Sequence, residues 1–254
     1  QIEAAYQTYL DLAETHVQRA HATRQRLHAD HGVPAPMLAD LDEYLAHAER
    51  QIDQIRRRVL QGETIPHGEK VFSIFQPHTE WISKGKAGVP VELGLRVAVV
   101  EDQHRFILHH QVMVKTTDDQ IAVALVEHTQ TRFPAVKAMS FDKGFHSPGN
   151  QTELKQRLEN VILPKKGRLS EADKARESAP EFVRLRRQHS AVESAINALG
   201  VHGLDKCPDH GIAGFKRYVA LAIVARNIQR LGAVLREQEQ QEAARRRGPY
   251  KKAA

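Results

Sequence analysis

Residues 136–145 read VKAMSFDKGF and contain the residue on which the interpretation of this chain depends. The apolar run is typical of a short buried strand that ends at Asp142, and Lys143 and Gly144 predict a turn directly after it. In an α/β sheet, a carboxylate at the C-terminal tip of a strand is held by a rigid scaffold and is open to solvent. Asp142 is therefore the first candidate site residue.

A second stretch, RRQHSAVESAINALG (186–200), has helical spacing that leaves Glu193 at the edge of its apolar face. Mg²⁺ and Mn²⁺ prefer oxygen ligands, so Asp142 and Glu193 together suggest a shared divalent metal site for phosphoryl transfer. Two other interpretations stay open from the residues alone. A strand-end Asp often caps a turn, and a helical Glu close to Arg186 and Arg187 often forms an ion pair.

The composition describes an ordinary globular protein that is large enough for one core plus a helical piece. The chain has 254 residues, of which 41% are hydrophobic and 27% are charged. A formal net charge of +6 and a pI of about 9.5 favour a polyanionic partner such as nucleic acid, but they also fit a basic solvated surface. The single cysteine, Cys207, excludes an internal disulfide framework and suggests a reducing cytoplasm. We also expect no membrane span, since no apolar run reaches about 18 residues.

The periodicity divides the chain into a helical front, a mixed core and a basic tail. Residues 1–62 predict two long helices that form an antiparallel α-hairpin. Residues 70–236 predict an α/β fold in which helices cover a mixed sheet, and 237–254 predict a disordered tail. The expected strands are 71–75, 91–100, 105–114, the run ending at Asp142, and 161–164; the expected helices are 116–133, 146–159, 170–187, 188–199 and 211–236.

Longer motifs carry a family resemblance, in order and spacing: IFQPHTEWISKGKAGVPVELGLRV, SFDKGFHSPGNQ, VILPKKGRLS, RRQHSAVESAINALGVHGLDKCPDHG and FKRYVALAIVARNIQRLG. They resemble the C-terminal part of bacterial insertion-sequence transposases of the DDE class, in the group that includes the ISNCY-type elements. The resemblance extends from the helical hairpin to Leu235. It implies a ribonuclease-H-like core that cuts and joins DNA with two Mg²⁺ (or Mn²⁺) ions held by an Asp, Asp, Glu triad. The second Asp of that triad falls on Asp142 and the Glu on Glu193.

The chain departs from this family at the first Asp, which lies there on an opening strand in a segment resembling V-D-x-T. No such strand precedes the helical hairpin, so we expect the first Asp upstream of Gln1 and the hairpin to be an insertion into the catalytic core. The available carboxylates are poor substitutes because of their predicted places on a helix, in a turn or at a helix start: Asp11, Asp102, Asp118 and Asp119. The alternatives are an inactive remnant that binds DNA or oligomerises, and a ribonuclease-H-like nuclease without strand transfer.

Basic residues near the expected site are candidates for contact with the DNA backbone: Lys84, Lys86, Lys165, Lys166, Arg186, Arg187 and His189. A plain hairpin loop, a solvated turn and ion pairs with Glu181 or Glu193 are the competing explanations. The resemblance implies double-stranded DNA at transposon ends and targets as the partner, a homodimer on that DNA, and a cytoplasmic, nucleoid-associated protein. We do not expect zinc at His202, Cys207 and His210, because structural zinc takes four ligands.

Overall fold

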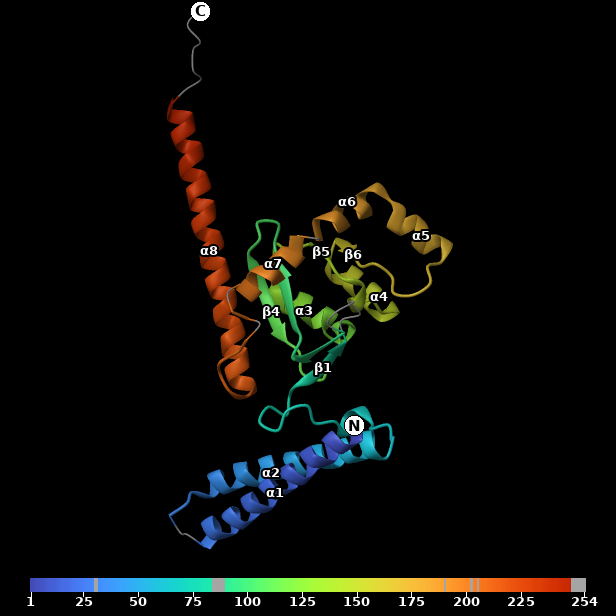
Figure 1. The fold of residues 1–254 in the computed structure, drawn as a ribbon. Helices are drawn as coiled ribbons and strands as arrows, with labels where there is room; N and C mark the ends of the chain where they lie inside the picture. Colours follow the sequence, from blue (N-terminus) through green and yellow to red (C-terminus); the bar gives the residue numbers. More distant parts are fainter. Residues whose placement is uncertain (30–31, 84–89, 190, 202, 205, 248–254) are drawn as a thin grey trace, which may run out of the picture. The chain divides into compact units, whose positions relative to one another are not determined.

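The computed structural model describes the chain except for residues 30–31, 84–89, 190, 202, 205 and 248–254, and it describes no side chain in 188–195. The fold is mixed α/β, which confirms the expected class at that level. Two compact units make up the chain, Gln1–Leu95 and Arg96–Ala254 (Figure 1). This division falls after the second strand, whereas the sequence suggests a boundary between 62 and 70. The assignment of residues 1–62 as an insertion stays a prediction.

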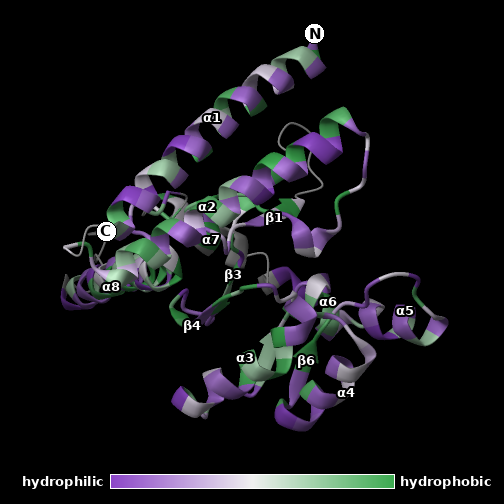
Figure 2. Cartoon of the chain, turned by 90° about the horizontal axis from the view of Figure 1, so that it is seen from below, coloured by the Kyte–Doolittle hydropathy of each residue, from purple (hydrophilic) through white to green (hydrophobic). Residues whose placement is uncertain are grey.

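The first unit begins with two helices that pack against each other in antiparallel orientation. α1 (Ile2–Ala29) and α2 (Ala35–Ile55) are joined by a bidentate pair in which Arg24 donates to Asp42 at 2.8 and 2.7 Å. His21 and Glu49 add a 2.7 Å contact further along. Hydrophobic and hydrophilic residues alternate along both helices in Figure 2, as expected for helices that bury one face. α2 ends in a π-helical turn, η1 (Arg56–Leu60).

The expected strand at 71–75 is wrong. Only a short 3₁₀ turn, η2 (His67–Glu69), lies nearby, and the backbone of Val71 bonds to a side chain instead of a strand. The Val71 N–H donates to Gln54 Oε1 at 2.8 Å, and the ring of Phe75 lies 5.3 Å from that of Tyr44. Val71 and Phe75 contact α2 instead of a neighbouring strand. A short, mostly apolar run is expected in both cases, so the sequence pattern does not tell them apart.

The first strand pair of the molecule belongs to the same unit. β1 (Glu80–Ser83) and β2 (Val91–Gly94) pair in antiparallel fashion. The expected single strand at 91–100 is therefore two strands, because β2 pairs with β1 while β3 (Val97–Glu101) pairs with β4 (Ile107–Val112). The chain passes from one sheet to the other at residues 95–96, and the hydrophobic pattern of 91–100 does not show this change of sheet.

In the second unit, the β3–β4 pair has helices on both faces. Ala98 and Val100 pack against α3 (Asp118–Arg132), while the alternate residues Val97 and Val99 pack toward α7 (Ala191–Val201) and α8 (Gly211–Arg247). α3 starts at Thr117 with a capping box, as its Thr-Asp-Asp sequence predicts. Successive strand residues point to opposite faces, so a strand covered on both sides reads as continuously apolar.

The remaining strands form a parallel pair that carries Asp142. β5 (Ala138–Ser140) runs into the turn η3 (Lys143–Phe145), and α4 (Pro148–Arg157) then returns the chain to β6 (Asn160–Ile162). One core cluster joins α3, α4 and these strands: Ala122, Val126, Phe141, Leu154, Leu158 and Leu163. On the other side, α6 (Pro180–His189) contacts both β5 and β6. The two strand pairs thus share α3 as a common support.

The C-terminal part differs from expectation in length. The charged segment 170–187 forms two helices, α5 (Glu171–Ser178) and most of α6, instead of the single expected helix. α8 continues to Arg247, so the predicted disorder from residue 237 is wrong up to that point. The far half of α8 runs beyond the strands in Figure 1, and all its side chains from 236 to 246 are exposed. By length and composition alone, α8 also meets the requirements for a membrane span, which no apolar run in the sequence had suggested.

Candidate functional site

The turn that presents Asp142 is tied to the strands on one side and to itself on the other. The Phe141 N–H donates to the carbonyl of Ile162 at 2.9 Å, and the Phe145 N–H donates to the carbonyl of Asp142 at 3.1 Å. Phe141 is buried and its ring lies 5.7 Å from that of Phe145. Asp142 itself is exposed. The structure therefore places Asp142 just past the C-terminal end of β5, on a well-supported turn.

Asn150 ties this turn to the helices beside it, and sequence reasoning missed it. Its Nδ2 donates to the carbonyl of Asp119 at 2.6 Å and to the carbonyl of Phe145 at 2.8 Å. Its own N–H donates to Ser147 Oγ at 3.1 Å, which caps α4. Asn150 is only 8% exposed, so these bonds lie away from water. The Ser-Pro-Gly-Asn sequence signals a helix start, but nothing local predicts the bond to α3.

At Gly144 the turn lies close to the Asp118 side chain at the start of α3. A Cβ at residue 144 would lie 2.4 Å from Asp118 Oδ2, a distance that two atoms cannot occupy without displacement. The Asp118 carboxylate, predicted only as the start of a helix, thus lies against the same turn as Asp142. Both residues line one cavity.

That cavity, of about 960 Å³, is a slot between the two strand pairs of the second unit. Consecutive residues 97–102, including β3, and 135–142, including β5, line it, together with Leu185 of α6 and Ile196 of α7. Alternate residues of a strand point to opposite faces, so consecutive residues line a cavity only where the edge of the strand faces it. Among the described residues, β3 pairs only with β4 and β5 only with β6. The slot therefore has two open strand edges as its walls.

Two polar atoms in the walls of the slot are buried without a hydrogen-bond partner. They are Glu101 Oε2, at the end of β3, and Ser140 Oγ, in β5. Burial raises the pKa of Glu101, and the nearby cations Arg226 and Arg105 partly oppose that rise. Buried polar groups normally find partners in a complete fold. Glu101 and Ser140 thus lack hydrogen bonds that a complete fold normally supplies.

Glu193 lies on α7, but its side chain falls outside the described part of the chain. Its helix does reach the slot, since Ile196, three residues further along, lines the cavity with Asp142. The donor chemistry fits Mg²⁺, which takes carboxylate oxygens. Within the described residues, however, no group of three or more His, Cys, Asp or Glu side chains is placed to hold a metal ion.

The predicted DNA-binding residues fall into three groups. Lys84, Lys86 and the side chain of His189 lie outside the described residues. Arg186 and Arg187, on α6 next to the cavity residue Leu185, are exposed, as is Lys166. Arg186 and Arg187 thus belong to the helix that contacts β5 and β6, and Lys166 lies in the loop that follows β6.

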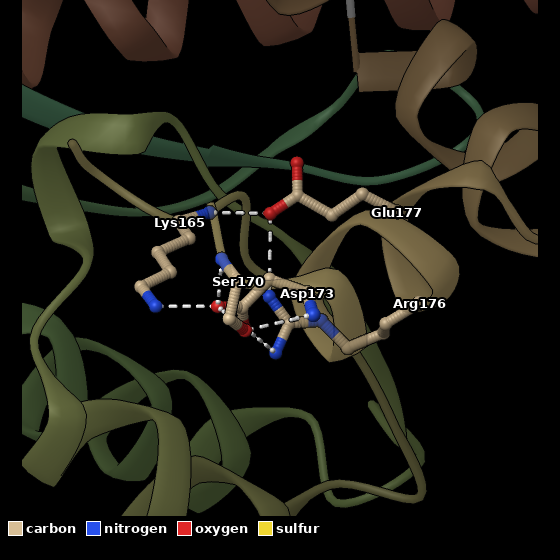
Figure 3. Close-up of polar contacts among 5 residues, drawn as sticks. All are labelled: Lys165, Ser170, Asp173, Arg176 and Glu177. Atoms are coloured by element: carbon tan, nitrogen blue, oxygen red, sulfur yellow. Dashed lines mark hydrogen bonds and ion pairs between the residues drawn. The ribbon is translucent and has the colours of Figure 1, made fainter. Parts of the chain in front are cut away.

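Lys165 differs from its neighbour because its half-buried side chain forms an ion pair within the protein (Figure 3). Its Nζ donates to the Asp173 carboxylate, and its backbone N–H donates to Glu177 Oε1 at 2.8 Å. Asp173 also accepts a 2.6 Å bond from the Ser170 hydroxyl at the start of α5. Lys165, followed by Ser170, holds the pKa of Asp173 well below its usual range. The structure thus gives Lys165 a role in attaching α5, which the sequence did not reveal.

Comparisons of this chain with protein-family models, with curated proteins and with solved structures found no match.

Proposed function

We propose that this chain is the catalytic part of a DDE transposase, which cuts and joins DNA at the ends of an insertion sequence. One observation carries the proposal: the exposed Asp142 lies past the end of β5 at a slot that the helix of Glu193 also reaches through Ile196. Both positions are the ones that the family resemblance assigns to the triad. Helices on both faces of the β3–β4 pair support the ribonuclease-H-like core that we propose for this site.

The slot supports the part of the proposal that concerns the first Asp of the triad. A strand between β3 and β5 would pair with both open edges and join the two strand pairs into one mixed sheet. Its polar groups would reach the unpaired Glu101 and Ser140 atoms. We propose that a strand outside residues 1–254 fills the slot and brings the first Asp beside Asp142. The hairpin of α1 and α2 would then be the insertion between that strand and the rest of the core.

In this proposal the candidate site residues have three separate roles: metal binding, support of the Asp142 turn, and contact with the DNA backbone. Asp142 and Glu193, with the Asp of the added strand, would hold the Mg²⁺ or Mn²⁺ ions. When bound, such a pair of ions activates the attacking oxygen and stabilises the leaving oxygen of a phosphodiester. Phe141, Phe145 and Asn150 keep the Asp142 turn in place. Lys166, Arg186 and Arg187 would position the phosphate backbone without reading its sequence.

The test is metal-dependent cleavage of plasmid DNA that carries the ends of the element, by the gene product that includes the added strand. We expect Mn²⁺-dependent nicking and joined products, and we expect Asp142→Ala and Glu193→Ala each to reduce both to background. Glu159→Gln is the matched control, because this exposed carboxylate lies at the opposite, N-terminal end of the β5–β6 pair. Unchanged cleavage by Asp142→Ala would remove this residue from the site.

The alternatives differ in outcome. An inactive remnant would bind the DNA ends without cutting them under any metal condition. A nuclease without strand transfer would nick the plasmid in Mn²⁺ and never yield joined products. In the bacterial cell, the proposed activity takes place on the nucleoid in the cytoplasm.

A further inference from the structure

The long helix α8 carries a stripe of large apolar side chains that the second unit does not cover. The exposed fractions are 65% for Leu221, 52% for Val224, 64% for Ile228, 48% for Leu231 and 49% for Leu235. Their spacing alternates between three and four residues, which is the a and d pattern of a heptad repeat. Scattered exposed apolar residues need no explanation, but a continuous stripe at this spacing is typical of a helix that pairs with another helix.

The opposite side of the same helix is fixed to its own unit. Val219, Ala222 and Ile223 are buried in a cluster with residues of β4 and α7. Asn227 bonds with both backbone groups of Ile107, accepting from its N–H and donating to its carbonyl, each at 2.9 Å. Because these contacts determine the rotation of α8 about its axis, the stripe faces away from the unit's core.

We infer that this stripe binds the same stripe of a second copy, with the two α8 helices antiparallel. In this register Val224 packs on Leu235 of the other copy, and Ile228 packs on its Leu231, so that a positions meet d positions. The far half of each α8, which projects beyond its own strands (Figure 1), then lies along the packed half of the other. The arrangement is two-fold symmetric and closes as a dimer.

Charge at the two ends of the stripe selects this direction. In the antiparallel register, Arg217 of one copy lies opposite Glu242 of the other, and both side chains are about two-thirds exposed, at 65% and 66%. Within its own chain Arg217 bonds with Asp209 at 3.0 Å and Glu242 lies 3.9 Å from Arg246, so the contact between copies adds an opposite charge to each of these pairs. A parallel pair would instead place Arg217 against Arg217 and Glu242 against Glu242, which is the less favourable arrangement. The seam from Arg217 to Glu242 is about 38 Å long, from the rise of 1.5 Å per residue of an α-helix.

Small residues beside the stripe fit a close helix partner. Ala225 and Gly232 occupy equivalent positions one heptad apart, next to Val224 and Leu231. A glycine is unfavourable in a helix interior, and an added Cβ at Gly232 would touch only the end of the Arg236 side chain, at 3.7 Å. No described contact within the unit therefore requires a glycine at residue 232. The absence of a side chain there lets a second helix approach closely.

This inference names the surface of the homodimer that the proposed function calls for, but it does not rest on that function. Its experiment contains no DNA and no metal ion, so it can fail while DNA cleavage succeeds, and the reverse. A bilayer is the other apolar environment that α8 could enter by length and composition.

Analytical ultracentrifugation of the whole chain tests the self-association. We expect the wild type to sediment as a dimer of the 28.6 kDa chain and Ile228→Glu/Leu231→Glu to sediment as a monomer, with a dimer Kd weakened by about 100-fold or more. The matched control is Gln240→Glu/Ala244→Glu, which adds two carboxylates to exposed positions on the other side of the same helix. It should stay dimeric, and circular dichroism should show equal helix content in all three proteins.

Disulfide cross-linking tests the direction in the folded protein, in a Cys207→Ser background. A mixture of Val224→Cys and Leu235→Cys chains should form a linked heterodimer, and neither variant should link to itself. Self-linking of Val224→Cys would overturn the antiparallel register. A monomeric wild type at about 100 µM, a concentration at which a Kd of order 1 µM leaves roughly 7% of the chains monomeric, would overturn the dimer. So would a monomer that floats with phosphatidylcholine vesicles through the same stripe.

Discussion

Asn150 shows how strongly one side chain can determine the geometry of the candidate site. Its side-chain amide joins the start of α3 to the Asp142 turn, and its backbone N–H bonds to Ser147 at the cap of α4, so that residues up to 31 positions apart in the chain are connected. An asparagine can bond to both carbonyls because its side-chain NH₂ group carries two donors. The position of Asp142 therefore depends on a residue eight positions away that has no chemical role.

We predict that Asn150→Ala lowers the free energy of unfolding by about 2–3 kcal/mol, because it removes the two hydrogen bonds that this buried amide donates. Urea titration followed by circular dichroism measures the change. Thr152→Ala, at an exposed position of the same helix, is the control and should change the free energy of unfolding by less than about 0.5 kcal/mol. A loss as small as that of the control would show that these bonds contribute little.

Adjacent lysines after β6 should respond to substitution in opposite ways. Lys165→Met removes the partner of Asp173 and should lower the urea midpoint, while the salt dependence of DNA binding stays the same. Lys166→Met, at an exposed position, should leave the midpoint unchanged and reduce the slope of log K against log salt by about 1. Fluorescence anisotropy with duplex DNA measures the slope. Equal effects of the two variants on DNA binding would argue against the structural role of Lys165.

At the level of elements, β4 and α3 bring imidazole rings together in a half-buried layer. The ring of His109 lies 5.7 Å from that of His128, and His109 Nε2 is buried without a hydrogen-bond partner. Burial lowers the pKa of His109, and the charges of His110, His128 and Arg132 lower it further. Burial also lowers the pKa of His110, followed by the charge of Arg132. The packing of β4 on α3 thus favours neutral imidazoles.

We predict that stability falls as the pH drops below about 6.5, the ordinary histidine pKa. Just below that pH, His109 and His110 become protonated in the unfolded chain while they stay neutral in the folded protein. The unfolded state therefore binds more protons and is favoured. Above that pH, both histidines are neutral in the folded and in the unfolded state, so they no longer lower the free energy of unfolding. The urea midpoint should therefore be lower at pH 5.5 than at pH 7.5. His109→Leu should reduce this difference, whereas His16→Leu, on the exposed side of α1, should not.

For the whole molecule, the contacts define two units with unequal cores. All three clusters of buried residues lie in Arg96–Ala254, while Gln1–Leu95 buries scattered residues such as Leu10, Leu45 and Ile52. Buried apolar area is the main source of stability, so the first unit should be the weaker one.

We therefore predict two thermal transitions in calorimetry, the first from Gln1–Leu95. Ile52→Ala should lower only the first transition and Leu154→Ala only the second, each by about 2–5 kcal/mol of unfolding free energy. Each variant is the control for the other. A single transition that shifts with both substitutions would show that the units unfold together.

The sequence by itself determined the helical hairpin pattern, the start of α3 at Thr117, and the turn after β5 that presents Asp142. These features depend on neighbours within a few residues, through periodicity, capping and glycine. Tertiary structure alone decided that 71–75 packs on α2, that 91–100 divides between two sheets, and that Lys165 bonds with Asp173. It also decided the slot between β3 and β5 and the uncovered stripe of α8. Each of these depends on which distant segment lies opposite, and an apolar or charged residue looks the same in sequence whether its partner is near or far.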